Sequence, residues 1–571
     1  MLTKYIILFH YFHFFVIITN GFRKGRDYMD ITNNIKQEIS NVLSKLNVDG
    51  DIAYVVEIPK DSSKGDYATN IAMQLTRVLK KNPRVIAEEI VSLFNKDVCD
   101  IEKIEIAGPG FINFFVKATS FSSLIKHVLD NPDNFGHQNY GQGKKYNVEF
   151  VSANPTGDLH LGHAWQAALG DSICNLLEAV GYDVTREYYV NDAGVQIKKL
   201  SESIYCRYQQ ALGIDVKFPE DGYHGPDIIK FADSLKEQYG DTLLEKPLTY
   251  FREIGIKHEL EKIIKDLDMF RVKFDVYSHE VMLYEKGWVE EVIPTLAKKG
   301  YIYEQDDAIW FRTTDFEDDK DRVVKKSDGT YTYFLPDIAY HKYKLERGYD
   351  YLVNILGADH HGYIKRMEAA ICALGYQKDQ IQIIIHQMVK LIKDGTELKL
   401  SKRTGKAYTL KDLCDEIGVN ATRYQFASKN PGSHMEIDID LAVKQSNENP
   451  VYYIQYAHAR CCSIEESYKT LNISDDTSGL LLTNAKEVAL LKYIGEFEKV
   501  VLDAALNKSP YKVTNYLYTL ASLFHTFYNE CKVIDVNNLE MTAQRVVLAK
   551  MTRIIIKNGL KLVGVEALNK M

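Results

Sequence analysis

Residues 147–163 read NVEFVSANPTGDLHLGH, and this stretch decides how the fold is interpreted. An apolar strand at 147–151 is followed by a polar loop and then by a helical pattern over 160–180, which Gly181 ends. A second apolar strand follows at 184–190. Strand, loop, helix and strand in this order are typical of the opening of a doubly wound parallel sheet. We therefore predict an α/β fold with a Rossmann-type domain.

The chain on the N-terminal side of this unit has a different pattern. Residues 104–106 alternate between apolar and polar, 108–110 read Gly-Pro-Gly, and 111–116 resume as a strand, which together predict a hairpin. Residues 119–140 read as a helix and a loop. We expect a small α+β domain over residues 29–118.

On the C-terminal side, a mostly helical and polar segment at about 200–325 is interpreted as an insertion into the sheet, which returns at 351–356 and 381–386. We therefore assign residues 140–445 to the Rossmann-type domain. From about 446 to 571 almost everything reads as helix, which predicts a helical bundle. Its apolar residues recur at helical spacing in three sets: Val488, Leu491, Ile494, Phe497 and Val501; Val513, Leu517, Leu520, Phe524 and Phe527; Val547, Met551 and Ile554.

Composition bounds the class of protein. The 571 residues are 46% apolar and 26% charged, which is ordinary for a soluble globular protein. The net charge of −8 argues against a dedicated nucleic-acid binder, although a large acidic enzyme can carry local basic patches. The eight cysteines form no CxxC pair, so we expect no structural zinc and free thiols in a reducing cytosol. The expected localisation is cytoplasmic.

The first 28 residues stand apart from the rest. Residues 6–19 are mostly apolar and aromatic, and they are followed by Arg23, Lys24 and Arg26. The stretch is short for a membrane span and shows no small-residue cleavage pattern. We interpret Met29 as the natural start and residues 1–28 as an upstream or leader segment. A membrane anchor is the alternative, but no membrane partner is expected.

The first chemical signal is the pair of histidines in His160-Leu161-Gly162-His163. They lie where a strand hands over to a helix, at the edge of a sheet where α/β proteins bind ligands. A helix N-terminus attracts phosphate, two imidazoles can donate hydrogen bonds to phosphate oxygens, and Gly162 lets a nucleotide approach the backbone. The alternative is a pair of helix-start histidines without a ligand.

Two further signals follow along the chain. Residues 399–403 read KLSKR before Thr404-Gly405, a basic loop suited to the charge that builds on leaving pyrophosphate, or else an ordinary solvated charge run. Residues 357–361 read GADHH directly after an apolar strand. A carboxylate there can hold ribose hydroxyls. Histidines beside an aspartate also suit a metal, but no third ligand at zinc spacing is visible, so we favour the nucleotide.

In chain order, the three signals at 160–163, 357–361 and 399–403 resemble the HIGH motif, the Gly-x-Asp and the KMSKS loop of the class I aminoacyl-tRNA synthetases. The resemblance implies that His160 and His163 contact ATP phosphates, that Lys399 and Lys402 stabilise the transition state, and that Mg²⁺ accompanies ATP. It implies ATP binding by Gly162, Gly357, Asp359, His360 and Met388. The HIGH region comprises Ala153, Asn154, Pro155, Thr156, Gly157, Asp158, Leu159, His160, Leu161, Gly162 and His163.

Three longer stretches resemble the arginyl-tRNA synthetase family specifically. They are 148–157 (VEFVSANPTG), 333–340 (YFLPDIAY) and 449–460 (NPVYYIQYAHAR), and the resemblance covers about residues 29–571. It implies that Asp337 and Tyr333 grip the arginine guanidinium, a charged planar fork that needs carboxylates. It also implies that Glu149 lies near the α-amino group and that Asn154 helps to hold that end of the substrate.

The resemblance also assigns the outer domains and the course of the reaction. Residues 29–118 would contact the corner of tRNA(Arg), and residues 446–571 would bind its anticodon, where aromatic side chains can stack on unpaired bases. Arginine would attack the α-phosphate of ATP, and the terminal ribose of the tRNA would then take the arginyl group. Activation commonly requires bound tRNA in this family, and we hypothesise a misplaced KLSKR loop until tRNA docks. A monomer without an editing domain is expected.

Two departures from the family pattern bear on the site. Asp158 stands where the family usually has Pro, and Leu400 replaces the usual Met of KMSKS. A carboxylate beside a triphosphate is electrostatically unfavourable unless it faces away or helps to hold magnesium. The rival interpretations are a shorter nucleotidyl transferase with the same HxGH, a cysteine-type synthetase with thiolate-bound zinc, and a tRNA-binding paralogue without aminoacylation activity. The intact histidine and basic motifs favour the enzyme.

Overall fold

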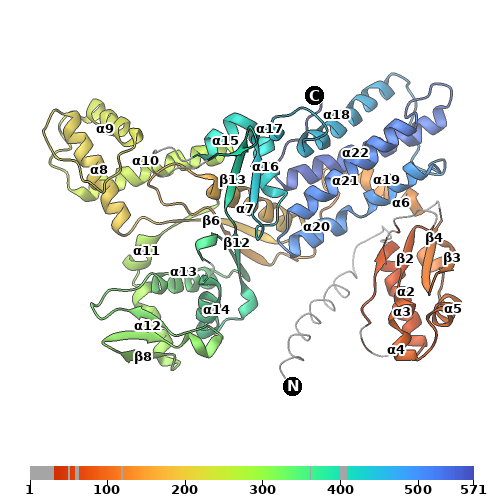
Figure 1. Cartoon of the computed structure of the whole chain (residues 1–571), viewed down its shortest axis with the longest axis horizontal. Coiled ribbons are helices and arrows are strands. Elements are labelled where there is room, and N and C mark those ends of the chain that lie inside the picture. The colour runs from red at the N-terminus through yellow and green to blue at the C-terminus, as the bar shows by residue number, and fades with distance from the viewer. Residues whose placement is uncertain are drawn as a thin grey trace.

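The computed structural model describes residues 31–48, 50, 52–57, 59, 64–117, 120–360, 362–398 and 408–571 (Figure 1). The leader segment expected at residues 1–28 lies outside the described residues. So do Lys399 and Lys402 of the basic loop and His361 of the GADHH stretch. Of the residues that are described, none forms a helix long and apolar enough to cross a membrane.

The central sheet has five parallel strands within the described chain, in the order β12-β11-β5-β6-β7. These are β5 (Lys145–Glu149), β6 (Asp183–Val190), β7 (Val276–His279), β11 (Tyr351–Gly357) and β12 (Ile381–His386). The chain order reverses between β5 and β11, which is the topological switch point where doubly wound sheets bind ligands. The predicted Rossmann-type fold is confirmed, and 147–149, 351–356 and 381–386 are strands of this sheet.

Helix α7 (Leu161–Ala179) follows β5 and fills the centre of the molecule. Its side chains are buried on nearly every face, with Trp165 and Leu169 inaccessible to solvent, so it reads as a core helix rather than an amphipathic one. The core around α7 is continuous with that of the C-terminal helices. The N-terminus of α7 is therefore held rigidly against both the sheet and the helical domain.

The insertion begins with three helices. Helices α8 (Val195–Ala211), α9 (Pro226–Tyr239) and α10 (Leu248–Met269) form a lobe with its own small core, which includes Leu200 and Phe251. Residues 200–325 are mostly helical, as predicted, but the segment is not wholly an insertion, because β7, which was not predicted, joins the central sheet beside β6. Four residues are too short for a periodic signal, which explains the error.

A second lobe lies between β7 and β12, and its elements share one core. It contains a three-stranded antiparallel sheet in the described chain, ordered β10-β9-β8. Its elements are α11 (Glu280–Glu285), α12 (Trp288–Lys298), β8 (Ile302–Gln305), β9 (Ala308–Phe311), a 3₁₀ turn (Thr313–Phe316), β10 (Arg322–Lys325), α13 (Phe334–Glu346), 3₁₀ turns at Ala358–His360 and Lys378–Gln380, and α14 (Tyr363–Leu374).

After β12 the chain forms a small connecting layer that leads to the helical domain. It consists of β13 (Val389–Lys393), β14 (Thr396–Glu397), α15 (Leu410–Ile417), α16 (Val419–Ala427), β15 (Met435–Asp438) and α17 (Ile439–Ala442). Strand β13 pairs with both β14 and β15. In the chain, the β13–β14 hairpin therefore precedes residues 399–407 and α15 follows them.

The C-terminal part is a helical bundle, as predicted. It contains α18 (Pro450–Lys469), α19 (Ala485–Gly495), α20 (Phe497–Leu506), α21 (Tyr511–Glu530) and α22 (Leu539–Leu562). The predicted apolar face of α21 is buried at all five positions. The face predicted at 488–501 is split between α19 and α20, because the helix breaks at Gly495–Glu496 while the apolar spacing continues.

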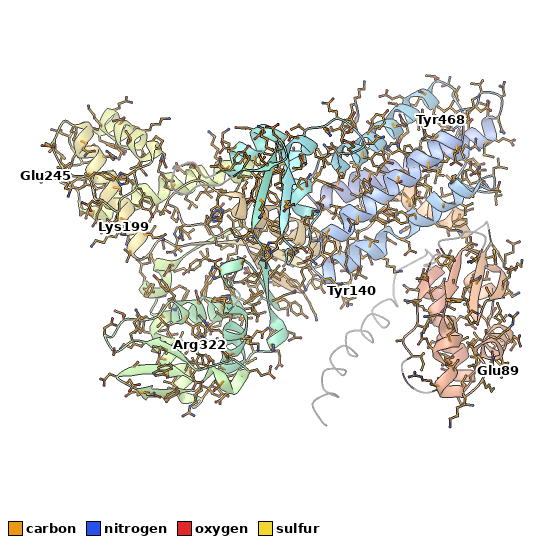
Figure 2. The ribbon with its side chains drawn as sticks, in the orientation of Figure 1. Glu89, Tyr140, Lys199, Glu245, Arg322 and Tyr468 are labelled. Carbon is orange, nitrogen blue, oxygen red and sulfur yellow. The ribbon has the colours of Figure 1, made fainter. Side chains whose placement is uncertain are left out.

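The N-terminal α+β domain is a four-stranded antiparallel sheet in the order β1-β2-β4-β3, packed against helices. The hairpin predicted around the Gly-Pro-Gly turn is confirmed as β3 and β4. Figure 2 marks this domain by Glu89, the α8–α10 lobe by Lys199 and Glu245, and the second lobe by Arg322. The domain's elements are α2 (Ile31–Lys45), β1 (Val56–Glu57), β2 (Tyr67–Thr69), α3 (Ile71–Gln74), α4 (Thr76–Leu79), α5 (Pro83–Leu93), a 3₁₀ turn (Asp97–Cys99), β3 (Ile101–Ala107) and β4 (Phe111–Val116), with α6 (Ser120–Asp130) leading onward.

Candidate active site

The turn after β5 is strained. Val151 and Ser152 have φ of +67° and +37°, a conformation that is rare for any non-glycine residue and especially for a β-branched one. Hydrogen bonds hold it in place: the backbone N–H of Tyr189 donates to Ser152 Oγ at 3.0 Å, and the Tyr188 hydroxyl donates to the carbonyl oxygen of Ala153 at 2.7 Å. The chain thereby turns sharply at the switch point and delivers the HIGH region to the sheet edge.

His160 and His163 form a hydrogen-bonded cap at the start of α7. His160 Nδ1 accepts from the N–H of Gly162 at 3.1 Å, and His163 Nδ1 accepts from the N–H of His160 at 3.3 Å. The two rings stack with their centroids 3.6 Å apart. Because each Nδ1 is an acceptor, each neutral ring carries its proton on Nε2, where it is a donor. The structure therefore brings together two donors of the kind a phosphate needs.

The charge state of His163 follows from its surroundings. Burial, together with the neighbouring His160 and His386, lowers the pKa of its imidazole to about 3. His163 is therefore neutral at physiological pH and acts by hydrogen bonding and not by charge. The N-terminus of α7 adds positive potential at this site.

His386 is a site residue that the sequence interpretation missed. It ends β12, its Nε2 lies 3.0 Å from the Gln166 amide nitrogen, and its Nδ1 lies 2.9 Å from the carbonyl oxygen of Gln387. Burial lowers the pKa of its imidazole. A Cβ placed on Gly162 or on Gly357 would lie 3.6 or 3.9 Å from the His386 ring. The ring therefore stands between these two glycines, and only its position at a strand end could have indicated it.

Gly357 is the last residue of β11, and Asp359 and His360 lie in the 3₁₀ turn that follows it. A Cβ on Gly357 would lie 2.9 Å from Asp359 Oδ1, so a larger residue would displace that carboxylate. The Asp359 side chain is 83% exposed, and the His360 ring lies 3.5 Å from it. Met388, also predicted at the nucleotide, is 68% exposed just beyond His386. Among the described residues no group of three or more His, Cys, Asp or Glu side chains is arranged to hold a metal ion.

Glu149 lies at the end of β5 and is buried. The ammonium of the fully buried Lys344 donates to its Oε2, and the Asn354 amide donates to the same atom at 3.4 Å. The Ser152 hydroxyl donates to Oε1 at 3.3 Å. Lys344 comes from α13 and gave no motif signal in the sequence. Glu149 therefore enters the site already paired with a cation.

Asp337 lies in the first turn of α13, in a group of acidic and phenolic side chains. Burial, with the negative charges of Glu149 and Glu280, raises the pKa of its carboxyl to about 7, while a hydrogen bond from Tyr363 opposes the rise. Burial and Asp192 also raise the pKa of Glu280, which is bonded to Tyr189. Arg366 opposes the rise in the pKa of Asp337 but does not cancel it, and a mainly acidic group suits a cationic ligand. Glu280, Tyr189 and Tyr363 were not predicted.

Tyr333 and Asn154 are both predicted to contact arginine, but neither side chain is hydrogen-bonded to Asp337 or Glu149 in the described chain. Tyr333 is the residue before α13, and its side chain is 88% exposed, whereas Asp337 one turn later is half-buried. The helical spacing of four residues therefore does not bring the Tyr333 ring onto the Asp337 carboxylate. Asn154 donates from its amide to Gln196 Oε1 at 2.8 Å, which ties the HIGH region to α8.

The HIGH region is bonded to the chain that follows the basic segment. The N–H of Leu410 donates to the carbonyl oxygen of Leu159 at 2.7 Å, and His160 and Thr409 form a β-bridge. Thr409 then caps α15 by accepting from the N–H of Asp412. The described chain therefore resumes beside His160 at Thr409 and Leu410.

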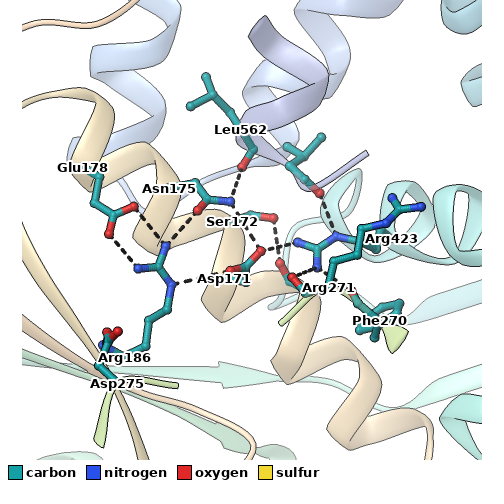
Figure 3. A network of polar contacts seen from close by, with 12 residues as sticks. Asp171, Ser172, Asn175, Glu178, Arg186, Phe270, Arg271, Asp275, Arg423 and Leu562 are labelled. Atoms are coloured by element: carbon teal, nitrogen blue, oxygen red, sulfur yellow. Dashed lines mark hydrogen bonds and ion pairs between the residues drawn. The ribbon is translucent and has the colours of Figure 1, made fainter. Parts of the chain in front are cut away.

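A buried polar network ties α7 to the rest of the molecule (Figure 3). Arg423 of α16 is fully buried, pairs with Asp171 of α7, and donates to the carbonyl oxygens of Val563 at 3.2 Å and Phe270 at 2.9 Å. Arg186 of β6 lies 3.5 Å from the other side of Asp171 and donates to Glu178 at 2.6 Å. The catalytic helix, the insertion and the end of α22 thus meet at one side chain.

Three protein-family models match consecutive parts of the chain. The family model described as tRNA synthetases class I (R), catalytic domain, matches residues 125–219 and 231–458, so the fold is that of a class I aminoacyl-tRNA synthetase. The Arginyl tRNA synthetase N terminal domain model matches residues 33–116, and the DALR anticodon binding domain model matches 454–571. The chain belongs to the arginyl-tRNA synthetase family, as the sequence resemblance predicted.

Similar proteins agree over most of the chain. Arginine–tRNA ligase of Geobacillus kaustophilus is 51% identical, covering 95% of this chain and 100% of the relative, and that of Bacillus subtilis is 54% identical, covering 90% and 94%. A Campylobacter jejuni structure assigned as an arginyl-tRNA synthetase has a TM-score of 0.73 at 36% identity, covering 80% of this chain and all of its own. Thermus thermophilus arginyl-tRNA synthetase shares the fold, with a TM-score of 0.74 at 18% identity, covering 95% and 100%.

Proposed function

We propose that this chain activates arginine with ATP and transfers the arginyl group to the 3′ end of tRNA(Arg), releasing AMP and pyrophosphate. The observation that carries the proposal is the pairing of two unlike groups at one sheet edge. Histidine Nε2–H donors at the start of α7 suit phosphate, and the acidic group around Asp337 suits a guanidinium. The alternative of a tRNA-binding paralogue without activity leaves this pairing without a purpose.

The reaction needs no covalent intermediate on the protein. An oxygen of the arginine carboxylate attacks the α-phosphorus, pyrophosphate leaves, and arginyl-adenylate forms. The terminal ribose hydroxyl of the tRNA then attacks the activated carbonyl, and AMP leaves. His160 and His163 donate from Nε2 to phosphate oxygens, and Lys399 and Lys402, placed by resemblance, neutralise the leaving pyrophosphate.

Arginine selection falls to the acidic group. Asp337 provides the carboxylate that accepts from the guanidinium, and Glu280 adds negative potential close by. Glu149 and Asn154 orient the amino-acid end, with the negative charge of Glu149 moderated by Lys344. The exposed Tyr333 would have to turn inward to reach the substrate, so its predicted contact belongs to the ligand-bound state. Citrulline, which lacks the charge, gains little from Asp337.

ATP is proposed to lie across the switch point. Gly162 and Gly357 leave room for it beside His386, and Asp359, His360 and Met388 are available to its ribose and base. The site's described residues suit a nucleotide but supply no cluster of carboxylates for a metal. Mg²⁺ is therefore proposed to be held by phosphate oxygens and water, where it would reduce the negative charge of the triphosphate.

The outer domains are proposed to read the tRNA. Residues 29–118 would contact its corner and residues 446–571 its anticodon, with residues 140–445 carrying the chemistry. We propose a monomer that acts in the cytosol, in keeping with eight cysteines that are all free thiols in the described chain. The role of residues 1–28 as a leader segment stays a prediction.

ATP–pyrophosphate exchange with each of the twenty amino acids, with and without tRNA, tests the proposal. We expect exchange with arginine alone, and only when tRNA is present. Exchange with a different amino acid would refute the assignment of the acidic group around Asp337. Absence of exchange under every condition, in the full chain and in a chain starting at Met29, would favour the inactive paralogue.

A further inference from the structure

Asp158, the residue that departs from the family pattern, is held by a lysine of the insertion. The Lys262 ammonium on α10 lies 2.7 Å from Asp158 Oδ1, and Asp158 is two residues before His160 in the chain. The Asp158 side chain is 48% exposed and the Lys262 side chain 27%. Figure 1 shows α10 running from the lobe of α8 and α9 to the centre of the molecule. The contact therefore links the insertion to the HIGH region.

Lys262 is kept charged by the groups around it. Asp227 Oδ2 of α9 lies 3.3 Å from the ammonium, and Glu259 Oε2, one turn earlier on α10, lies 3.8 Å away. The Glu259 side chain is 1% exposed, and neither of its oxygens has a hydrogen-bond partner in the described chain. Burial lowers the pKa of Lys262, but Asp158, together with Glu259 and Asp227, raises it by more, so Lys262 remains an ammonium. Moving the Lys262 ammonium away would leave the buried Glu259 without its cation, which costs free energy.

The same turn is anchored from its other side. Leu159 accepts from the N–H of Leu410, and His160 bridges to Thr409, directly after the basic segment. Lys411 follows. Its pKa is raised mainly by Asp415, and Asp266 of α10 adds a weaker electrostatic attraction. The turn before α7 is thus held between α10 and α15. A shift of α10 would move Asp158, and with it the backbone that carries His160.

We propose that Lys262 is a positioning residue of the nucleotide site. It neutralises Asp158 and holds that carboxylate away from the path of the triphosphate, which lets this chain tolerate an acid two residues before His160. The inference rests on the proposed function, because it requires ATP at the N-terminus of α7. Without the ammonium, Asp158 is a free negative charge close to a triphosphate, and ATP binding weakens by like-charge repulsion.

The test is a charge-rescue series measured by tRNA-dependent pyrophosphate exchange. Lys262→Met is expected to raise the KM for ATP by roughly tenfold, with the KM for arginine within about twofold of wild type. Asp158→Asn in the same chain is expected to restore most of the ATP affinity, because the repelling charge is gone. Lys262→Arg keeps the charge and is expected to behave as wild type. Lys257→Met, which removes an exposed lysine 4.0 Å from Glu261 on the same helix, is the matched control.

Each outcome is decisive. A double variant as defective as Lys262→Met would show that the lysine acts through the fold of α10, and it would overturn the proposal. If Lys262→Met fails to fold by thermal melting, Asp158→Asn alone decides: we expect that it does not lower the KM for ATP, since Asp158 is already neutralised. A several-fold fall would show that Asp158 repels ATP in the intact chain, against the proposal. An inactive wild type would instead refute the proposed function.

Discussion

Acidic side chains outnumber basic ones around the position proposed for the arginine guanidinium. Glu149 is paired with Lys344, whereas Asp337 is held by the Tyr363 hydroxyl and has a pKa raised to about 7. Such a carboxyl is costly to ionise without a ligand and is stabilised when a cation arrives. We therefore expect the ionised Asp337 carboxylate to lower the free energy of unfolding in the ligand-free chain and to be stabilised when arginine binds.

Asp337→Asn is expected to separate these two effects. Loss of the charged pairing should raise the KM for arginine by roughly 100-fold or more in tRNA-dependent exchange, with the KM for ATP little changed. The exposed Asp315→Asn, in the same lobe, is the control. An unchanged KM for arginine would remove Asp337 from the recognition site.

The raised pKa of Asp337 also predicts how stability varies with pH. A folded-state pKa of about 7, against 3.8 in the ordinary carboxyl, means that the folded chain binds the extra proton. Its contribution to stability is present below pH 4 and is lost as the pH rises through 7. Asp337→Asn should therefore melt at a higher temperature than wild type at pH 8 and at nearly the same temperature at pH 4.5. A lower melting temperature at pH 8 would contradict this assignment.

His163→Asn tests the neutral donor at the phosphate site. We expect kcat for exchange to fall by roughly 100-fold, because one preorganised donor to the transition state is lost, with the KM for arginine within twofold. The exposed His434→Asn is the control. NMR of the wild-type ring should show no titration above pH 5, since the pKa of His163 is lowered to about 3. A ring that titrates near pH 6.5 would refute the neutral donor.

At the scale of elements, the sequence predicted what periodicity and turn residues encode. The strands β5, β6, β11 and β12, helix α7 and the Gly-Pro-Gly hairpin all carry such local signals. Strand β7 was missed because it has only four residues, and the break between α19 and α20 was missed because the apolar spacing continues across it. Both are decided by tertiary packing rather than by local pattern.

The Ser152 hydroxyl is one of the groups that hold the strained turn between β5 and α7. Ser152→Ala removes the acceptor for the Tyr189 N–H and one donor to Glu149. We expect the free energy of unfolding to fall by about 1–3 kcal/mol, because a buried N–H is left unpaired. Urea denaturation measures it, with the surface Ser234→Ala as control. A loss no greater than in the control would show that the turn is held by other contacts.

The whole molecule determines the parts of the site that no motif could show. His386, Glu280 and Lys344 lie on separate elements, and each gave at most a strand-end or single-charge signal in the sequence. Lys262 reaches Asp158 from an insertion 104 positions away. Family resemblance predicted the residues within motifs, but the partners that set their charge and position became visible only in the fold.

Arg423 joins the helical domain to α7 at this largest scale. Arg423→Met would leave Asp171 buried with a weaker partner and the carbonyl oxygens of Val563 and Phe270 without their donor. We expect a loss of about 3–5 kcal/mol in unfolding free energy. The exposed pair Lys550–Asp475, at 2.7 Å, provides the control Lys550→Met with a loss below about 1 kcal/mol. Equal losses in the two variants would refute the central role of Arg423.

The central claim is that this site charges tRNA(Arg) with arginine by recognising the guanidinium through carboxylates. Its most direct test is aminoacylation of tRNA(Arg) by the wild-type chain, with arginine and with citrulline, which has nearly the same shape but no charge. We expect charging with arginine and a kcat/KM for citrulline lower by roughly 10⁴-fold or more, because buried carboxylates would lack their partner. Comparable charging with both, or with neither, would contradict the account.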